Sequence, residues 1–379
     1  MVYITTKYAP VQHQMTIEEL FSNRSVERPQ SRRSMTATRT VRVDEASDRL
    51  RDSIDVTYLI GRLREFNEQT KALREQDRDS LYTTFYVPKR SGGLRQIDAP
   101  CPELMDALRV LRRILTEDFR ALYHTSAYAY IGGRCTVDAV KVHQANESKW
   151  FVSLDLSNFF GSTTLDFMMR QFGLVFPFSE IVKYPSGKSE LETALSLATK
   201  NGVLPQGTPI SPLITNVMMI PCDYELTKKL RNFEKNCYVV TRYADDFDIS
   251  SKYDFDYHKI EGVVREVLAG FDAPFKLNEK KTHYCSSSGK NYMLGLLLNK
   301  DNEITVGHKA KRQFQNMLHA YVMDRRNGKP WDVHDVQVLK GHYDYYYGVE
   351  KAATIGIVEH MNQKLNADIL RYMKEDMSA

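Results

Sequence analysis

Apolar residues recur at steps of three and four in several long stretches, which is the spacing of one face of an amphipathic helix. The first stretch runs from Asp44 to about Asp79 and places on that face Leu50, Ile54, Tyr58, Leu59, Leu63 and Phe66. The second covers 102–123 and holds Leu104, Leu108, Leu111, Leu115, Phe119 and Leu122. From about Lys309 the pattern returns with Phe314, Met317, Leu318, Tyr321 and Val322, and then with Val333, Val336, Leu339, Tyr343 and Tyr346. The pattern predicts helices in the first third and at the end of the chain.

Shorter runs between these stretches have the character of strands. Residues 81–90 and 94–100 flank a Ser-Gly-Gly turn, which predicts a hairpin because glycine supplies the positive φ of a tight turn. The run WFVSLDLSNFF at 150–160 begins as an apolar strand and ends in a carboxylate and two phenylalanines. The run CYVVTRYADDFDIS at 237–250 predicts two short strands around a tight turn at Ala244-Asp245-Asp246.

The segment GVLPQGTPISP at 202–212 contains two glycines and three prolines, so we expect a loop. Ser211 followed by Pro212 predicts the start of a helix, with the serine hydroxyl as cap. We expect this helix to be kinked at Pro221. The run NYMLGLLL at 291–298 predicts one more strand, and EITV at 303–306 is a candidate to pair with it.

Composition changes this picture little. The 379 residues carry 52 Lys and Arg against 48 Asp and Glu, and this small excess of positive charge does not identify a nucleic-acid-binding protein. No stretch of about 18 apolar residues predicts a membrane span, and the first residues lack the pattern of a secretory signal. The five cysteines form no CxxC pair, so neither a zinc site nor a disulfide framework is indicated. We therefore expect a soluble, reduced, cytoplasmic protein.

The segment 22–42 is strongly basic. It contains six arginines and one acidic residue, Glu27, and few large apolar residues. Such a composition is typical of a flexible stretch. A solvated linker and an arm that contacts nucleic acid explain it equally well.

Three carboxylates, Asp155, Asp245 and Asp246, stand out because each lies next to a strand-like apolar run. A buried carboxylate is unfavourable unless it is paired or binds a cation. Asp155 and Asp245 can clamp two Mg²⁺ ions if their strands are neighbours, and two such ions serve an in-line phosphoryl displacement. Oxygen ligands without nearby His or Cys favour Mg²⁺ over Zn²⁺. The plainer interpretation of an Asp-Asp pair is turn chemistry alone.

Six motifs in order between about 80 and 300 resemble those of reverse transcriptases. Tyr243-Ala244-Asp245-Asp246 resembles the YxDD box, and LDLSNFF at 154–160 resembles the motif of the first catalytic aspartate. GVLPQGTPISPL at 202–213 is similar to the PQGxxxSP loop. The other three are the fingers hairpin with Lys89, Gly92, Gly93 and Arg95, the segment LNEKKT at 277–282 and the primer-grip strand at 292–296. The RYADD form is most similar to bacterial reverse transcriptases related to group II intron and retron enzymes.

Missing elements narrow the resemblance. DAVKVHQANES at 138–148 differs from the Asn-Ala-x-x-His element usual in retron enzymes, and Met293-Leu294-Gly295 stands where they usually carry Val-Thr-Gly. No maturase or HNH motif follows, and the QGTPISP loop argues against the diversity-generating group. The chain is most similar to the stand-alone, defence-associated bacterial reverse transcriptases.

The resemblance implies an α+β right-hand polymerase with an antiparallel palm sheet. We expect a helical N-terminal extension at 1–79, fingers and palm at 80–300, and a helical thumb at 301–379. The implied activity is RNA-directed DNA synthesis from dNTPs with two Mg²⁺ ions, for which Mn²⁺ can substitute. The implied partner is a cognate non-coding RNA template, in bacterial antiviral defence. Alternatives are a template-independent or protein-primed DNA polymerase, a retron-type enzyme that makes RNA-linked DNA, and a nucleic-acid-binding protein with an inactive polymerase fold.

The resemblance also assigns roles to individual residues. Asp155, Asp245 and Asp246 would hold the metals, and Lys89 and Arg95 would bind the triphosphate of the incoming nucleotide. The nucleotide site would further include Phe160, Gln206 and Gly207. Phe160 would exclude a 2′-hydroxyl, unless it is a core residue as we expect for Phe159. Gly207 would let the backbone approach the template.

Lys281 either protonates the pyrophosphate leaving group or neutralises phosphate. The thumb residues Lys309, Lys311 and Arg312 would follow a duplex backbone, although a solvated helix end explains the same charges. Arg242 precedes the aspartate pair and is expected to buffer nearby acids. For the tyrosine run at 343–347 we favour packing over a priming hydroxyl.

Overall fold

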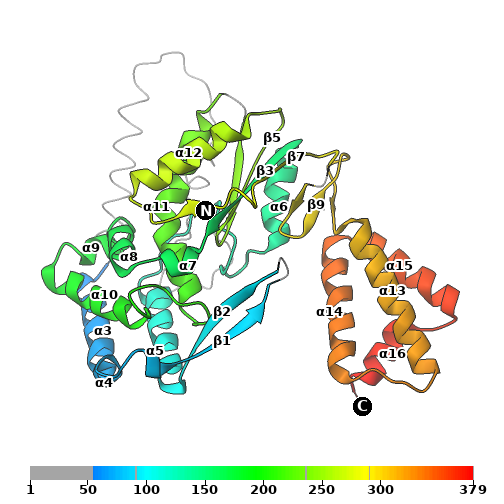
Figure 1. Ribbon diagram of the computed structural model, residues 1–379, viewed down its shortest axis with the longest axis horizontal. Coiled ribbons are helices and arrows are strands. Elements are labelled where there is room, and N and C mark those ends of the chain that lie inside the picture. Colours follow the sequence, from blue (N-terminus) through cyan, green and yellow to red (C-terminus); the bar gives the residue numbers. More distant parts are fainter. Residues whose placement is uncertain (1–53, 90–91, 235–236, 290, 379) are drawn as a thin grey trace.

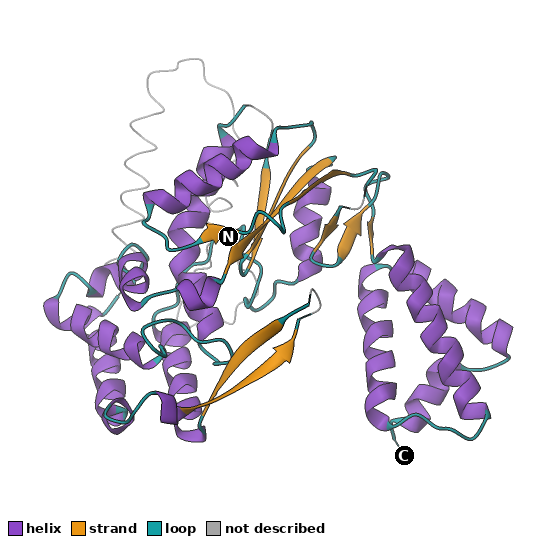
Figure 2. Cartoon of the chain, viewed as in Figure 1, coloured by secondary structure: helices purple, strands orange, loops and turns teal. Residues whose placement is uncertain are grey.

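A computed structural model describes residues 54–89, 92–234, 237–289 and 291–378 (Figure 1). The basic segment 22–42 and the first residues of the helical pattern, 44–53, lie outside the described residues. Helices and antiparallel strands are mixed along the chain (Figure 2), so the predicted α+β class is confirmed.

Before residue 200 the predicted elements occur in the predicted order, and the structure adds helices between 136 and 145 and between 159 and 197 that were not predicted. The helices are α3 (Val56–Gln69), α4 (Lys71–Arg74), α5 (Pro102–Arg113), α6 (Thr136–Ala145), α7 (Phe159–Ser162), α8 (Leu165–Phe172), α9 (Phe178–Ile181) and α10 (Pro185–Leu197). The 3₁₀ turn η1 (Asp79–Leu81) precedes β1, and the π turn η2 (Ile114–Asp118) extends α5. The strands are β1 (Tyr82–Pro88), β2 (Leu94–Pro100) and β3 (Trp150–Ser157).

The second half contains the remaining strands and the longest helices. The strands are β4 (Val239–Tyr243), β5 (Asp246–Ser251), β6 (Lys276–Leu277), β7 (His283–Ser286), β8 (Tyr292–Met293), β9 (Leu296–Leu298) and β10 (Ile304–Thr305). The helices are α11 (Ser211–Arg231), α12 (Tyr257–Gly270), α13 (Gly307–Arg326), α14 (Val333–Val349), α15 (Lys351–Leu365) and α16 (Ile369–Asp376).

The central sheet has the order β4-β5-β3-β6, with β7 also paired to β3, and all its pairings are antiparallel. Alternate residues of β3 and β5 point to opposite faces. Val152 and Ile249 join the main core together with α11 and α12. Phe151 joins a smaller cluster with α6 and strands β8–β10 on the other face (Figure 1). Helices therefore cover both faces of the strands that carry the three aspartates.

Helix α3 buries the predicted apolar face in the main core rather than forming a separate cluster. Leu63 and Phe66 are almost fully buried there. The Asp55 side chain caps the helix by accepting from the backbone N–H of Tyr58 at 2.9 Å. The helix predicted at 102–123 is shorter in the structure. Its regular part ends at Arg113, and the π turn that follows ends at Asp118.

Two local predictions were wrong. The segment 291–298 is a hairpin of β8 and β9 rather than one strand, because Leu294 and Gly295 take positive φ values of 53° and 83°. Ser211 does not cap α11; its hydroxyl donates to the Pro205 carbonyl, and its N–H is satisfied by the Thr208 hydroxyl. Helix α11 continues through Pro221 as one element.

Helices α13–α16 form a bundle with an apolar core of their own, which includes Phe314, Leu318 and Val336. In the view of Figure 1 the bundle stands beside the rest of the molecule and is reached through β9 and β10. Tyr343 and Tyr346 pack against its core, whereas Tyr345 is 43% exposed. The packing interpretation is confirmed for Tyr343 and Tyr346.

Candidate active site

Strand pairing brings the three predicted aspartates together. Asp155 lies directly opposite Asp246 in the register of β3 and β5. Asp245 occupies the turn between β4 and β5, where Ala244 has a φ of 59°, and the backbone N–H of Leu156 donates to the Asp245 carbonyl at 3.1 Å. Residues 90 positions apart in the sequence therefore converge at one end of the sheet.

Burial and mutual repulsion disfavour the charged forms of these carboxylates. Burial, followed by the charge of Asp245, raises the pKa of Asp246 to about 7. Burial and the Asp155 charge raise the pKa of Asp245 as well. A neighbouring carboxyl, Asp248, is fully buried with a pKa raised to about 6, and it accepts from the Ser153 hydroxyl. A cation at this end of the sheet would relieve the repulsion.

Two side chains from the segment after α12 bind Asp155. Lys281 Nζ lies 2.5 Å from one carboxylate oxygen, and Asn278 Nδ2 donates to the other at 3.2 Å. The Asn278 backbone N–H also donates to the Asp155 carbonyl at 2.8 Å. The hydrogen bond to Asp155 raises the pKa of Lys281. Sequence reasoning missed Asn278, although it lies inside the LNEKKT motif.

The donor chemistry of the site fits Mg²⁺, because it consists of carboxylate oxygens that are partly desolvated and surrounded by negative charge. The geometry of a closed metal cage is not formed: in the described parts of the chain, no three His, Cys, Asp or Glu residues are grouped to hold an ion. The carboxylate of Asp155 is instead bound to Lys281 and Asn278.

A cleft of about 1030 Å³ opens beside the aspartates. Its walls are the hairpin β1–β2, the end of β3 and the loop at 200–206, and Asp155 and Asp245 line it. Four further predicted site residues lie in the wall: Lys89, Arg95, Gln206 and Lys281. The cleft therefore joins acidic groups to several cationic side chains.

Phe160 and Gly207 are not among the described residues that line this cleft. Phe159 and Phe160 both lie on the short helix α7, so the alternation of a strand does not decide their directions. Phe159 is 2% exposed and packs against Phe275, which confirms its core role, and Phe160 is half-buried against the same core.

Gly207 approaches the hairpin closely. Its φ is 112°, and a Cβ atom there would lie 2.8 Å from a methyl carbon of Ile97 and 3.0 Å from the Asp98 carbonyl. The neighbouring Gln206 carbonyl accepts from the Asp98 N–H at 2.8 Å. Because Gly207 has no side chain, the loop can pack directly against β2.

Asp98 and Lys200 form a second group in the cleft that sequence reasoning missed. Lys200 Nζ lies 2.8 Å from Asp98 Oδ1 and 2.9 Å from the Thr84 hydroxyl. Burial opposes ionisation of Asp98, but the bonds from Lys200 and Thr84 outweigh it and lower its pKa. The pair links the loop at 200–206 to both strands of the hairpin. No local sequence pattern predicts this contact.

The predicted nucleic-acid residues of α13 divide into two kinds. Lys309 and Arg312 are exposed. Lys311, in contrast, is bound at 2.7 Å by Glu350, which also accepts from the Thr305 hydroxyl and the Val306 N–H. Lys311 therefore helps to fix the junction between β10 and the bundle.

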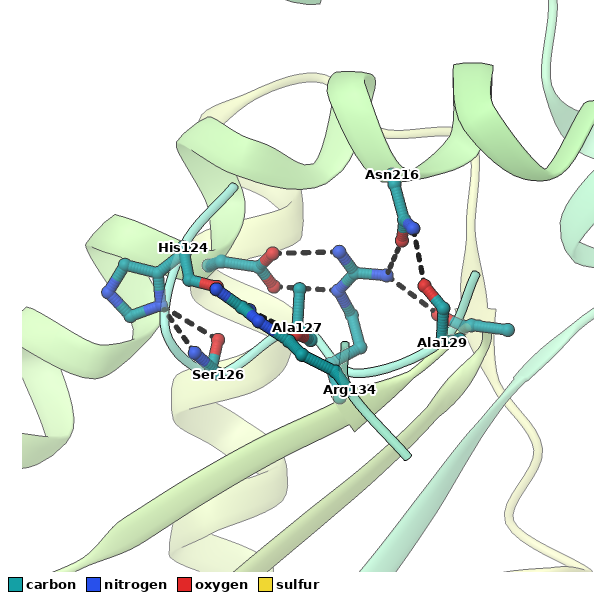
Figure 3. Close-up of polar contacts among 9 residues, drawn as sticks. His124, Ser126, Ala127, Ala129, Arg134 and Asn216 are labelled. Carbon is teal, nitrogen blue, oxygen red and sulfur yellow. Dashed lines mark hydrogen bonds and ion pairs between the residues drawn. The ribbon is translucent and has the colours of Figure 1, made fainter. Parts of the chain in front are cut away.

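Arg242 is fully buried in a polar network next to the turn that carries Asp245. Figure 3 labels Asn216 and Ala129, which belong to this network. The Arg242 guanidinium makes two bonds to Asp223, at 2.7 and 2.8 Å, and donates to the Ala244 carbonyl at 3.1 Å. Asn216 accepts from Arg242 at 3.3 Å and donates to the Ala129 carbonyl at 2.6 Å. The acid that Arg242 neutralises is thus Asp223, and the network ties the turn to the segment around Ala129.

A family model described as reverse transcriptase (RNA-dependent DNA polymerase) matches residues 87–314, more than half of the chain. The chain therefore belongs to the reverse transcriptase family, and its activity is RNA-directed DNA polymerisation. Within the described residues, no helix has the length and apolar character needed to cross a membrane.

Curated relatives include retron reverse transcriptases. The Ec83 enzyme of Escherichia coli is 26% identical over 300 residues, which cover 78% of this chain and 90% of the relative. The Mx162 enzyme of Myxococcus xanthus is 27% identical over 286 residues, covering 71% of this chain and 58% of the relative. A bacterial, retron-like reverse transcriptase is thus confirmed, whereas the finer assignment to stand-alone enzymes stays a prediction.

Among solved structures, telomerase from Candida albicans in complex with a fragment of telomeric RNA is similar to this chain. The TM-score is 0.43 at 10% identity, and the match covers 78% of this chain and 60% of that protein. Apo telomerase from Candida tropicalis gives a TM-score of 0.44 at 11% identity, covering 78% and 61%.

Proposed function

We propose that this reverse transcriptase copies a cognate structured RNA by two-metal nucleotidyl transfer, with Asp155, Asp245 and Asp246 holding Mg²⁺. The observation that carries the proposal is the convergence of these carboxylates at one end of the sheet, where Asp155 and Asp245 line a cleft with cationic side chains. We assign residues 80–300 to fingers and palm, 301–379 to the thumb and 1–79 to the N-terminal extension.

When bound, the two ions would stabilise the attacking and leaving oxygens of the transfer. The protein's own side chains bind and orient the nucleotide. Lys89 and Arg95 extend from the hairpin into the cleft wall, where charge-assisted bonds to a triphosphate are favourable. Lys281 lines the cleft and is paired with Asp155, and its raised pKa keeps it protonated, as either of its proposed roles requires.

We infer that Phe160 selects deoxyribonucleotides over ribonucleotides. The inference rests on its position five residues after Asp155. Its half-buried ring packs on the core and leaves part of its surface accessible. In single-nucleotide assays, Phe160→Ala should incorporate ribonucleotides far more readily while it retains some dNTP activity. An unchanged sugar preference in a folded variant places the selection elsewhere.

The proposed partner is a small structured RNA, and the proposed setting is antiviral defence in the bacterial cytoplasm. Lys309 and Arg312 are the exposed thumb residues that support contact with a duplex backbone. A specific observation favours the retron-type alternative, in which the DNA product stays joined to RNA, since the relatives named above are retron enzymes.

The test is extension by the purified full-length chain on an RNA template, with dNTPs and with Mg²⁺ or Mn²⁺. Synthesis that requires the template and Mg²⁺ supports the proposal, and synthesis without template favours the terminal-transferase alternative. Sequencing of the RNA that co-purifies from the native host identifies the partner, and the absence of an enriched species contradicts it. A DNA product that keeps a ribonucleotide after RNase treatment identifies the retron-type reaction.

A further inference from the structure

Tyr130 is an exposed aromatic residue that is held beside the catalytic turn in an unfavourable backbone conformation. Its side chain is 53% exposed. Its φ of 60° lies in the left-handed region, which residues other than glycine seldom adopt. Such strain persists only where the surrounding structure imposes it, and it gathers at functional sites.

The surroundings of Tyr130 are those of the active site. Its ring centroid lies 6.4 Å from that of Tyr243, the first residue of the YADD turn. Burial and the negative charge of Asp245 raise the pKa of its phenol, while Arg95 acts in the opposite direction. The side chain therefore lies near both the turn and the hairpin.

Tyr130 lies outside the nucleotide cleft, however. Neither Tyr130 nor Tyr243 belongs to the described residues that line the cleft, whereas Asp245 does. In an in-line transfer, the attacking and leaving oxygens lie on opposite sides of the transferred phosphorus. If the triphosphate occupies the cationic cleft, the end of the growing strand and its base pair lie beyond Asp245, on the side of Tyr130.

Buried polar contacts fix the backbone that leads to Tyr130. Asn216 donates to the Ala129 carbonyl at 2.6 Å, and the Tyr128 N–H donates to the Arg242 carbonyl at 2.9 Å. Arg134 donates to the carbonyls of His124 and Ala127 at 2.8 and 2.5 Å (Figure 3).

Arg242 also holds the turn that carries Asp245. Arg242 donates from its backbone to the Ser126 carbonyl at 2.6 Å and from its guanidinium to the Ala244 carbonyl at 3.1 Å. The Arg242–Asp223 pair thus fixes the position of Tyr130 relative to Asp245. Locked supporting side chains of this kind are what a precise binding site requires.

We propose that Tyr130 stacks on the terminal base pair of the template–product duplex and that Arg242 is a positioning residue for it. This inference rests on the proposed function, because it takes the cationic cleft as the nucleotide site. The ligand is a nucleobase, and the contact is tolerant of sequence because every base offers a π face.

The test measures duplex binding by the full-length chain without nucleotide, using a primer with 2-aminopurine at its 3′ end. Tyr130→Ala should weaken binding about 10-fold and abolish the fluorescence change at the primer end. Tyr130→Phe keeps the ring and should behave as the wild type. Tyr253→Ala, at a tyrosine that is 62% exposed elsewhere, is the matched control.

Wild-type affinity and fluorescence in a folded Tyr130→Ala variant would overturn the proposal, as would a defect confined to the KM for dNTPs. Arg242→Lys keeps the charge but loses the two-pronged bond, and it should reproduce the fluorescence loss. If that variant does not fold, Asn216→Ala tests the same support by removing the bond to Ala129. Failure of the proposed function is distinguishable, because a chain that binds the duplex but cannot extend it still reports on Tyr130.

Discussion

Two ion pairs in this molecule differ in how far they are buried. Behind the catalytic turn, the side chains of Arg242 and Asp223 are 0% and 1% exposed. At the base of the helical bundle, those of Lys311 and Glu350 are 26% and 16% exposed. Removal of charges from water is costly, so the first pair adds little net stability but is damaging to break, whereas the second, partly exposed pair should matter less in either respect.

The difference extends to the cores around the pairs. The bundle is stabilised by an apolar cluster that includes Phe314 and Leu318. The sheet beside the active site packs on the main apolar core through residues such as Val152 and Ile249, but it also buries polar groups. Buried His143 bonds to the hydroxyls of Ser250 at 2.6 Å and Thr241 at 2.8 Å. Burial lowers the pKa of His143 to about 3, so it stays neutral at physiological pH. Both regions are therefore stabilised by apolar burial, and beside the aspartates fully buried polar contacts add directional geometry.

The largest expected effect comes from the catalytic turn itself. Asp245→Asn keeps the side-chain shape but removes a negative charge, so single-turnover extension should fall by several orders of magnitude. Template binding should survive, because the cationic surface is unchanged. Asp272→Asn is the control, since that exposed residue has a φ of 50° that asparagine tolerates. Near-normal extension by Asp245→Asn would refute the metal assignment.

Breaking the buried pair should have the next largest effect. Asp223→Asn leaves Arg242 without its counter-charge, so the free energy of unfolding in urea should fall by about 3–5 kcal/mol. Arg242→Met in the same chain should recover part of this stability but not activity, because the bond to the Ala244 carbonyl is lost as well. Recovery of both would mean that the pair does not position the turn.

A contact in the fingers should matter less. Arg95→Ala should raise the apparent KM for dNTPs, because a charge-assisted bond of this kind contributes about 1.5–3 kcal/mol. Arg109→Ala, at an exposed arginine paired with Asp106 on α5, provides the matched control. A defect in template affinity alone would show that Arg95 does not bind the nucleotide.

The two regions also differ in what the sequence could predict. Helical periodicity located the face of α13 with Phe314 and Leu318, because a helix that packs only by apolar contacts displays its pattern locally. Motifs located Asp155, Asp245 and Asp246, and their resemblance to a known order supplied the pairing. The partners Asp223, Asn216 and Lys200 carried no local signal, because each meets its partner only through the tertiary fold. The 291–298 hairpin was missed because leucine seldom takes the positive φ that Leu294 has in the turn.

The carboxylates predict a pH dependence that the bundle should lack. Burial raises the pKa of Asp246 from 3.8 to about 7. Its contribution to stability is therefore complete below about pH 4 and is lost as the pH rises through 7. In metal-free protein, the free energy of unfolding should fall across this window by about 1–2 kcal/mol after solvent screening. Asp246→Asn should make this fall smaller without removing it, because Asp245 and Asp248 also have raised pKa values, and added Mg²⁺ should restore stability at pH 8. A profile that Asp246→Asn leaves unchanged would assign the effect to other groups.

The smallest effect is expected at the pair of the bundle. Lys311→Ala should reduce the free energy of unfolding by at most about 1 kcal/mol, as for other solvent-accessible pairs. Because Glu350 holds Lys311 at the junction, its loss should leave the salt dependence of duplex binding unchanged. Arg312→Ala, one residue further along the same helix and exposed, should lower the slope of that salt dependence by about one. Equal slopes for the two variants would place both side chains in the same role. A lower slope for Lys311→Ala alone would show that Lys311 leaves Glu350 to bind phosphate.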